Sequence, residues 1–565
     1  MSVDQRLRRA FSIAQGRWPQ RPNLWTIAVW AVAALVSLPI GVVLGSIFAD
    51  AGEIWVHLAT TVLPQYVINS LLLMVGVGAG TLIIGVGTAW LVTMCVFPGR
   101  RLFEWALLLP LAAPAYLLAY TYTDFLEYYG PVQTGLRSLL GWENANAYWF
   151  PNVRSLGGAI AMFSLTLYPY VYLLARVAFL ELSASTLEAS RSLGCGPWRS
   201  FYTVALPLAR PAVMAGISLA LMETLNDFGT VQYFSVPTFT TGIYRTWFGM
   251  GERVAAAQLS ATLLLFIFAL ILLERWSRRQ AKFYQTGQPG QRSTPYWLKG
   301  GRSPLAVLAC LLPVTLGLLL PGGLLVNMTL RNLDDTLDHS FWDLATHSLI
   351  LSVLTAAIAV SVSLLLAYGV RLTQNRLTRL GVRLAAMGYG VPGAVIAVGI
   401  LIPVARLDNA MAGWIEQIFG SSPGLLISGT ITALVFAYLV RFLAVALGAV
   451  ESGLAKIRPS LDDASRSLGY GPTGTLTRVH APLMVSSLLT AVMLVFVDVM
   501  KELPATLVIR PFNFDTLAVR VYQYAADERL MEASAPALMI LLVGLLPVIL
   551  LSWQIARASR LSSEP

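Results

Sequence analysis

Charged side chains are scarce in this chain, and their scarcity limits the classes of protein to which it can belong. Only 12% of its 565 residues are Asp, Glu, Lys or Arg, whereas 56% are hydrophobic. Soluble domains carry charge on about 25% of their residues. The net charge of +10 is spread over short segments between apolar runs, which is typical of membrane topology rather than of nucleic-acid binding. We therefore predict a polytopic membrane protein.

Residue types that support metal or covalent chemistry are also few. The three cysteines, Cys95, Cys195 and Cys310, lie far apart and predict no disulfide framework. The four histidines lack the spacing of metal ligands, so we expect no dedicated metal site. No Gly-x4-Gly-Lys-Ser/Thr motif occurs, and no catalytic constellation is recognisable. We expect a chain that is not an enzyme, binds no cofactor and leaves ATP to a partner.

The apolar runs predict an all-α fold with about 12 transmembrane helices in two homologous six-helix halves. Among them are helices expected over about 103–122 and 384–404. The first half covers residues 1–273 and the second covers 304–565, with a basic linker at 274–303 that is rich in Gly, Pro, Gln and Ser. The denser Lys and Arg clusters fall on one side, which predicts a cytoplasmic linker and two cytoplasmic termini.

A short basic stretch occurs twice and organises the rest of the chain. Residues 185–197 and 460–472 share the core Ala-Ser-Arg-Ser-Leu-Gly-x-Gly-Pro, and paired positions are offset by 275 residues (460 − 185). One copy alone would be read as an ordinary basic cytoplasmic loop. Repetition at a fixed spacing favours a duplicated functional unit instead.

Each copy predicts a helix, a glycine turn and a second short helix. Ser185 and Ser460 open Ser-x-x-acid patterns, which are typical of helix N-caps. Gly194 and Gly469 are expected to end these helices. Second helices are expected over 198–206 and 473–481, each ended by a proline.

These residues resemble the coupling-loop motif of importer-type ABC transporter permeases, Glu-Ala-Ala-x3-Gly-x9-Ile-x-Leu-Pro. The first copy carries Glu188, Ala189, Ser190, Gly194 and Pro207, and the second carries Asp463, Ala464, Ser465, Gly469 and Pro482. The second copy departs further, with Asp for Glu and Ala for Leu. The resemblance implies the type I ABC importer permease fold, with coupling loops at 181–210 and 451–482. Each loop would dock on one ATPase subunit.

The apolar segment after each coupling loop carries two acids. Glu223 and Asp227 are paired by the same offset of 275 with Asp498 and Glu502. A spacing of four places both acids of a pair on one helix face, and a charge at mid-membrane costs about 2.5–3.5 kcal/mol on insertion scales, so it should face a cavity or a partner. One hypothesis is a pathway for a cation, since oxygen ligands suit hard ions such as ferric iron. The alternative is structural, with Lys501 paired to Asp498 or Glu502.

Segments beyond these acids narrow the resemblance further. Residues 227–234, 240–248, 500–506 and 510–520 resemble the fused, two-permease-in-one-chain subunits of ferric iron importers of the Fbp, Sfu and Hit type, and the similarity covers nearly the whole chain. It implies a multi-pass protein of the bacterial inner membrane that contacts lipid but no nucleic acid. It also implies two copies of a separate ATPase and a periplasmic or lipid-anchored ferric-iron-binding protein, with iron free or chelated.

Other substrates and another class of transporter remain as alternatives. Fused permeases for thiamine or 2-aminoethylphosphonate have a similar plan. An ion-driven secondary transporter would also show duplication, but it would not predict two Gly-Pro loops at equal spacing.

Overall fold

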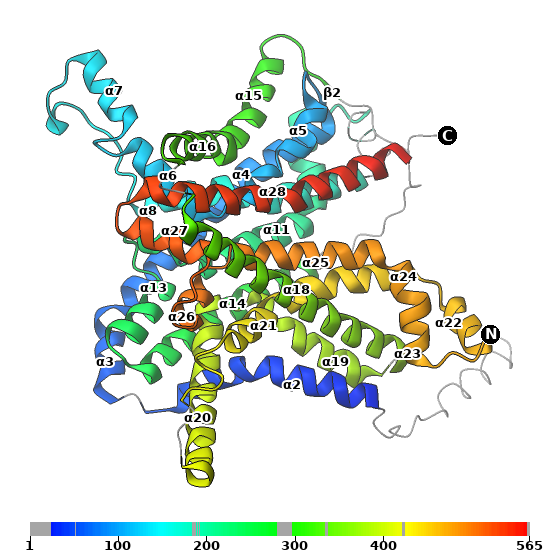
Figure 1. Ribbon diagram of the computed structural model, residues 1–565. Coiled ribbons are helices and arrows are strands. Elements are labelled where there is room, and N and C mark those ends of the chain that lie inside the picture. The colour runs from blue at the N-terminus through cyan, green and yellow to red at the C-terminus, as the bar shows by residue number, and fades with distance from the viewer. Residues whose placement is uncertain are drawn as a thin grey trace, which may run out of the picture.

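The computed structural model describes residues 24–50, 52–182, 188, 190, 192–279, 296–333, 337–373, 375–420 and 424–561. Within these residues the fold is almost entirely helical (Figure 1). Ten helices in this described part of the chain are long and apolar enough to cross a membrane, and two sharply bent pairs raise the number to as many as 12. The predicted all-α polytopic fold is confirmed.

The helices of the first half are α2 (Leu24–Gly45), α3 (Gly52–Thr61), α4 (Leu63–Met94), α5 (Arg100–Ala106), α6 (Ala115–Leu126), α7 (Pro131–Leu140), α8 (Leu156–Glu181), α10 (Pro197–Ser200), α11 (Leu206–Asn226), α12 (Gly229–Tyr233), α13 (Phe239–Tyr244) and α14 (Arg253–Arg279). Short 3-10 turns (η1, Ser46–Phe48; η2, Leu109–Ala112; η3, Ala145–Ala147) and π-helical turns (η4, Phe201–Ala205; η5, Arg245–Gly249) interrupt or join them.

The helices of the second half are α15 (Arg302–Val314), α16 (Leu320–Arg331), α18 (His339–Thr373), α19 (Arg376–Ala385), α20 (Gly393–Phe419), α21 (Ile431–Ala455), α22 (Pro459–Ser467), α23 (Pro472–Thr475), α24 (Ala481–Leu483), α25 (Val485–Met500), α26 (Pro504–Ile509), α27 (Leu517–Ala526) and α28 (Leu530–Leu561). The π turns η6 (Thr315–Leu319) and η8 (Leu476–His480) and the 3-10 turn η7 (Ala386–Gly390) complete the half.

The first span of each half packs on the other half. Helix α2 lies against α18, α19 and α20, whereas α15 lies against α4 and α5 (Figure 1). Strand β1 (Cys95–Val96) pairs in parallel with β2 (Tyr296–Trp297), which also joins the start of the second half to the first. The two sequence repeats are therefore interlocked rather than side by side, and both contribute to each hydrophobic core.

The third span of each half is broken where one continuous helix was expected. The helices on either side of Ala113 and Pro114 meet at 89°. Ala113 and its counterpart Val391 are extended, with ψ of 115° and 126°. Each precedes a proline, whose ring disfavours the α conformation in the residue before it. The expected helices at 103–122 and 384–404 are wrong in this respect, and α6 and α20 begin at the break.

Equivalent contacts recur in both halves and confirm the internal duplication. Asn69 Nδ2 donates to the Pro237 carbonyl at 2.9 Å, and His347 Nδ1 lies 3.2 Å from the Asp515 carbonyl. Both pairs are 168 residues apart in sequence. The duplication therefore extends from the coupling loops to tertiary contacts.

Candidate functional site: two coupling loops and a cavity between the halves

The glycine turn has the same backbone geometry in both coupling loops. Gly194 and Gly469 each have φ of +81°, in the left-handed region that favours glycine. Across the turns, the Cys195 amide donates to the Ser190 carbonyl and the Tyr470 amide to the Ser465 carbonyl, each at 3.1 Å. The predicted glycine turn is therefore confirmed in both loops.

A buried pair of hydroxyl groups closes each turn. Ser190 Oγ lies 2.8 Å from Ser200 Oγ, and Ser465 Oγ lies 2.8 Å from Thr475 Oγ1. The pairs occupy equivalent positions, 275 residues apart (465 − 190 and 475 − 200). Each motif serine thus joins the two sides of its glycine turn by a buried hydrogen bond.

The acid of each motif faces outward. Glu188, Asp463 and Ala464 are exposed, whereas both motif serines are buried. Ala189 lies outside the described residues. The described part of each loop therefore offers a solvent-facing surface that includes the motif acid.

Two predicted helix boundaries in the loops are wrong. Helix α22 begins at Pro459 with Arg458 at its N-cap, so Ser460 lies inside the helix and caps nothing. The helix of the first loop continues past Pro207 through α11 to Asn226, whereas the second breaks by 80° after Leu483. The π turn η4 precedes Pro207, and its wider turn accommodates a proline that would otherwise clash with a carbonyl. Ser185 lies outside the described residues.

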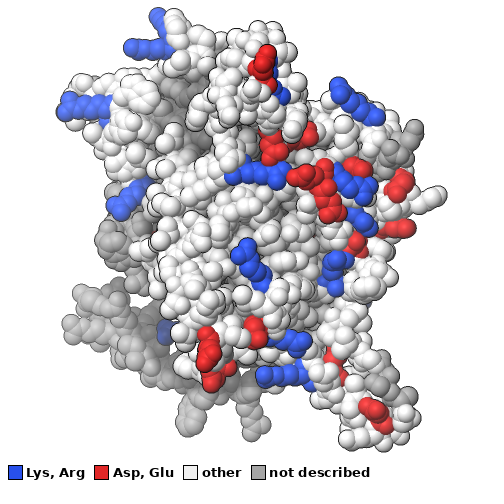
Figure 2. All heavy atoms as spheres, turned by 90° about the vertical axis from the view of Figure 1, so that its left-hand side faces the viewer, with Lys and Arg blue, Asp and Glu red and all other residues white. Residues whose placement is uncertain are grey.

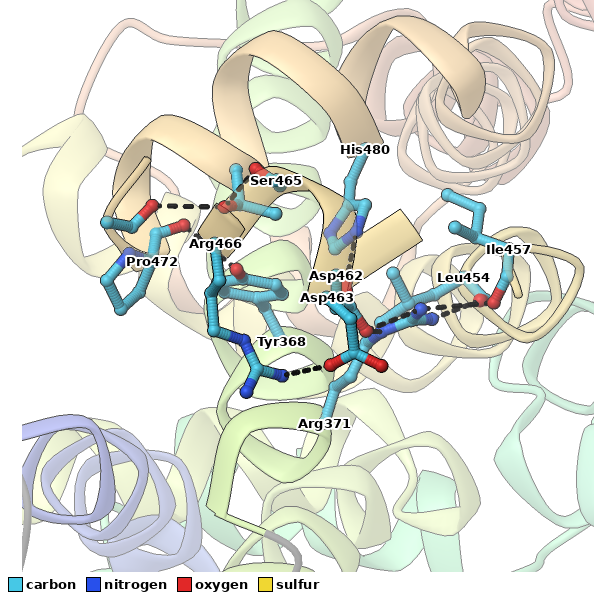
Figure 3. Close-up of polar contacts among 12 residues, drawn as sticks. Tyr368, Arg371, Leu454, Ile457, Asp462, Asp463, Ser465, Arg466, Pro472 and His480 are labelled. Atoms are coloured by element: carbon cyan, nitrogen blue, oxygen red, sulfur yellow. Dashed lines mark hydrogen bonds and ion pairs between the residues drawn. The ribbon is translucent and has the colours of Figure 1, made fainter. Parts of the chain in front are cut away.

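Polar contacts fasten the second coupling loop to the end of α18 (Figure 3). Arg371 Nε donates to Asp462 Oδ2 at 2.9 Å, and its other nitrogens donate to the carbonyls of Leu454 and Ile457 at 2.8 and 3.0 Å. Asp462 Oδ1 also lies 2.6 Å from His480 Nε2. The arginine therefore joins α18, the end of α21 and α22.

Aromatic packing fastens the first loop in the corresponding place. Trp90, near the end of α4, packs with Phe201 and Phe179 at centroid distances of 4.9 and 5.6 Å. Its counterpart Tyr368 instead donates its hydroxyl to the Pro472 carbonyl at 2.9 Å. The loops share a backbone geometry but differ in the chemistry that attaches them.

Replacing Arg371 with methionine is expected to loosen the second loop. The substitution removes three hydrogen bonds from a charged donor, and hydrogen bonds to charged groups contribute about 1.5–3 kcal/mol each. Amide hydrogen exchange over residues 454–480 should accelerate about tenfold or more, while exchange in the first loop stays unchanged.

Arg466 provides the control, because its partner Asp463 lies nearby but the side chains are 71% and 73% exposed. Exposed ion pairs contribute little, so Arg466→Met should leave exchange unchanged. Equal exchange in both variants would show that the Arg371 contacts do not hold the loop.

Both second acids lie at helix breaks, not on continuous helix faces. Asp227 follows the last residue of α11, and its carboxylate accepts the Thr230 amide at 2.9 Å at the start of α12. Glu502 follows α25 and accepts the Ala505 amide at 3.1 Å. The expectation that each pair shares one face of one helix is therefore wrong. The helices end between the two acids of each pair, and the second acid accepts a backbone amide of the next short helix.

Three of the four predicted acids line one cavity of about 100 Å³ between the halves. Glu223 and Asp227 reach it from the first half, and Glu502 reaches it from the second. Asp498 does not line it and pairs with Lys501 at 2.9 Å, as the structural alternative expected. No three His, Cys, Asp or Glu side chains of the described chain are placed to hold a metal ion.

A buried arginine that lines this cavity was not assigned from the sequence. Arg441 Nη1 lies 2.6 Å from Glu502 Oε1, and both side chains are buried. Gly393 leaves the space that this ion pair occupies. A Cβ at this position would lie 2.5 Å from Arg441 Nη1 and 2.6 Å from Glu502 Oε1, so any larger residue would clash with both side chains. The sequence does contain a signal for this site, because Arg441 is a charged residue within the apolar run 431–450. A charged residue inside a membrane span normally has a partner of opposite charge or faces a cavity.

The fold and the paired loops define an inner-membrane permease. Residues 22–282 and 359–560 match the family of binding-protein-dependent transport system inner membrane components. The chain belongs to this family, and the two matches correspond to its two halves. It is an ABC permease of the multi-pass, inner-membrane type.

The relatives that match most of this chain are ferric iron permeases. The chain is 26% identical over 549 residues to the Fe(3+)-transport system permease protein FbpB 2 of Haemophilus influenzae, covering 94% of this chain and 99% of the relative. It is 25% identical to the putative ferric transport system permease protein FbpB 1 of the same organism, covering 84% and 74%. The molybdenum transport system permease protein ModB of Escherichia coli is 28% identical, but the match covers 34% of this chain and 84% of that protein.

Proposed function

We propose that this chain is the permease through which ferric iron, free or chelated, crosses the bacterial inner membrane. One observation carries the proposal: the match to a ferric iron permease runs over 94% of this chain and 99% of the relative. Both halves of the fused architecture are therefore shared. The relatives are transport permeases, and the chain itself carries out no covalent chemistry in this proposal.

Two copies of a separate ATPase supply the energy in this proposal, one on each coupling loop. Their contacts are the exposed residues around Glu188–Pro207 and Asp463–Pro482, including Trp198 and Leu468. Closure of the ATPase dimer would move the loops, and the buried hydroxyl pairs would transmit that movement to α11 and α25. Access to the cavity would then alternate between the two sides of the membrane.

A periplasmic or lipid-anchored binding protein would deliver iron to the face opposite the coupling loops. Figure 2 shows this face, which includes α3, α7 and α13, with acidic and basic side chains interspersed among uncharged ones. Arg154 pairs with Glu127 at 2.5 Å and reaches Glu528 of the second half at 3.7 Å. A protein docked there would contact both halves at once, and so could sense their relative movement.

A second candidate is the same machine with another solute. This alternative is supported by matches to a molybdenum and a sulfate transport system permease protein, in addition to the ferric ones. Those matches cover about a third of the chain (34% and 35%). Thiamine or 2-aminoethylphosphonate belongs to the same alternative.

The proposal is tested by uptake of radiolabelled ferric citrate into cells that lack the chain and are complemented with it. We expect complementation to restore uptake and ATP depletion to abolish it. Growth on another solute without ferric uptake would remove iron from the proposal. Uptake that survives ATP depletion but collapses with the proton gradient would contradict the ATPase coupling.

A further inference from the structure

The charges around the cavity depart from the two-fold repeat. Helices α8 and α21 start 275 residues apart (431 − 156), so the counterpart of Arg441 is Thr166. The same offset pairs Lys501 with Asn226. Arg441 and Lys501 therefore have neutral counterparts in the first half, although the acids are repeated.

Both acids of the second half are neutralised by these bases. Glu502 pairs with Arg441 at 2.6 Å, and Asp498 pairs with Lys501 at 2.9 Å. In the first half, Thr166 donates only to carbonyls of its own helix, and Asn226 accepts the amide of Gly393 at 2.8 Å. Arg441 and Lys501 also line the cavity, but within the described chain neither Glu223 nor Asp227 forms an ion pair with them.

A buried hydroxyl group without a partner lies at the same cavity. Tyr116 lines it and is only 3% exposed. Its hydroxyl has no hydrogen-bond partner among the described residues. Buried polar groups normally have one, so this hydroxyl marks a place where a polar ligand could complete the contacts.

We infer that the cavity holds its cargo on one side, with Glu223 as the contacting carboxylate, Asp227 adding negative charge and the Tyr116 hydroxyl as a further oxygen ligand. This inference rests on the proposed function and names the residues that meet the cargo. The cargo is a cation or a cationic chelate, because the four acids of this region outnumber its two bases, Arg441 and Lys501, and both bases are already paired with acids of the second half. The acids of the second half bind Arg441 and Lys501 instead of the cargo. The cargo is therefore held from one side only, and this keeps its binding weak enough for release.

The test compares charge-changing and charge-conserving variants in the ferric citrate uptake assay, with membrane abundance measured for each. Glu223→Gln should lower the maximal rate about tenfold or more, whereas Glu223→Asp should keep most of it. Asn226→Lys places a cation three residues after Glu223, as Lys501 follows Asp498, and should lower the rate to a similar extent. Asn226→Met is the matched control, because it also loses the Gly393 contact but adds no charge.

Uptake by the wild-type chain distinguishes failure of the proposed ferric iron transport from failure of the one-sided cargo site. Absence of ferric uptake by wild type would contradict the proposed function itself. Normal wild-type uptake with equal rates for Glu223→Gln and Glu223→Asp would overturn the one-sided site alone. If Glu223→Gln fails to reach the membrane, the Asn226 pair decides, and equal rates for Lys and Met would likewise overturn the inference.

Discussion

Replacing Arg441 with methionine is expected to destabilise the chain by about 3–5 kcal/mol. The arginine is the buried partner of Glu502, and its loss leaves an uncompensated carboxylate between the halves. The contact also supports the start of α26, because Glu502 accepts the Ala505 amide there. The free energy of unfolding of the detergent-solubilised chain, from titration with sodium dodecyl sulfate, measures the effect.

The double variant Arg441→Met, Glu502→Gln should recover most of this loss. Glutamine keeps an oxygen for the Ala505 amide but carries no charge, and replacement of a whole buried ion pair is often nearly neutral. Thr166→Val is the matched control in the first half, with an expected cost below about 1 kcal/mol. A single variant as stable as the double one would show that the buried charge is not what the arginine compensates.

The features that could be predicted from the sequence are those that depend on neighbouring residues. Long apolar runs predict membrane spans, and a glycine followed closely by Gly-Pro predicts the end of a helix. The predicted turns at Gly194 and Gly469 are confirmed for this reason. The repeat itself was readable because both copies kept the same local requirements.

The remainder depends on contacts between residues far apart in the chain. Arg441 and Glu502 are 61 residues apart, and Arg371 and Asp462 are 91 apart. Local periodicity does not say which distant helix will meet a given side chain. For the same reason the exchange of α2 and α15 between the halves could not be predicted from either repeat alone. The breaks at the acids were missed because an acid at a helix end and an acid on a helix face have the same local spacing.

Replacing Gly469 with valine is expected to uncouple ATP hydrolysis from uptake while the chain still inserts. A β-branched residue is a genuine outlier at positive φ, and left-handed backbone costs an L-residue about 1–2 kcal/mol even without branching. No atom lies within 4 Å of a Cβ built on Gly469, so the effect acts through the backbone and not through a clash. The turn would open and separate Ser465 from Thr475, so that the loop could no longer transmit movement to α25. Ferric citrate uptake should fall about tenfold or more at unchanged membrane abundance.

Gly471 allows the cause to be isolated, because it lies two residues away and has an ordinary extended backbone with φ of −72° and ψ of 175°. A Cβ at Gly471 also meets nothing within 4 Å, so the two valine variants differ in backbone conformation and not in available space. Gly471→Val should therefore keep most of the uptake, and the same contrast should hold between Gly194 and Gly196 in the first loop. Normal uptake in both Gly194→Val and Gly469→Val would remove the coupling role from these loops. Loss of uptake in all four variants would point to the exposed surface of the loops, and not to the left-handed turn, as the feature that the ATPase requires.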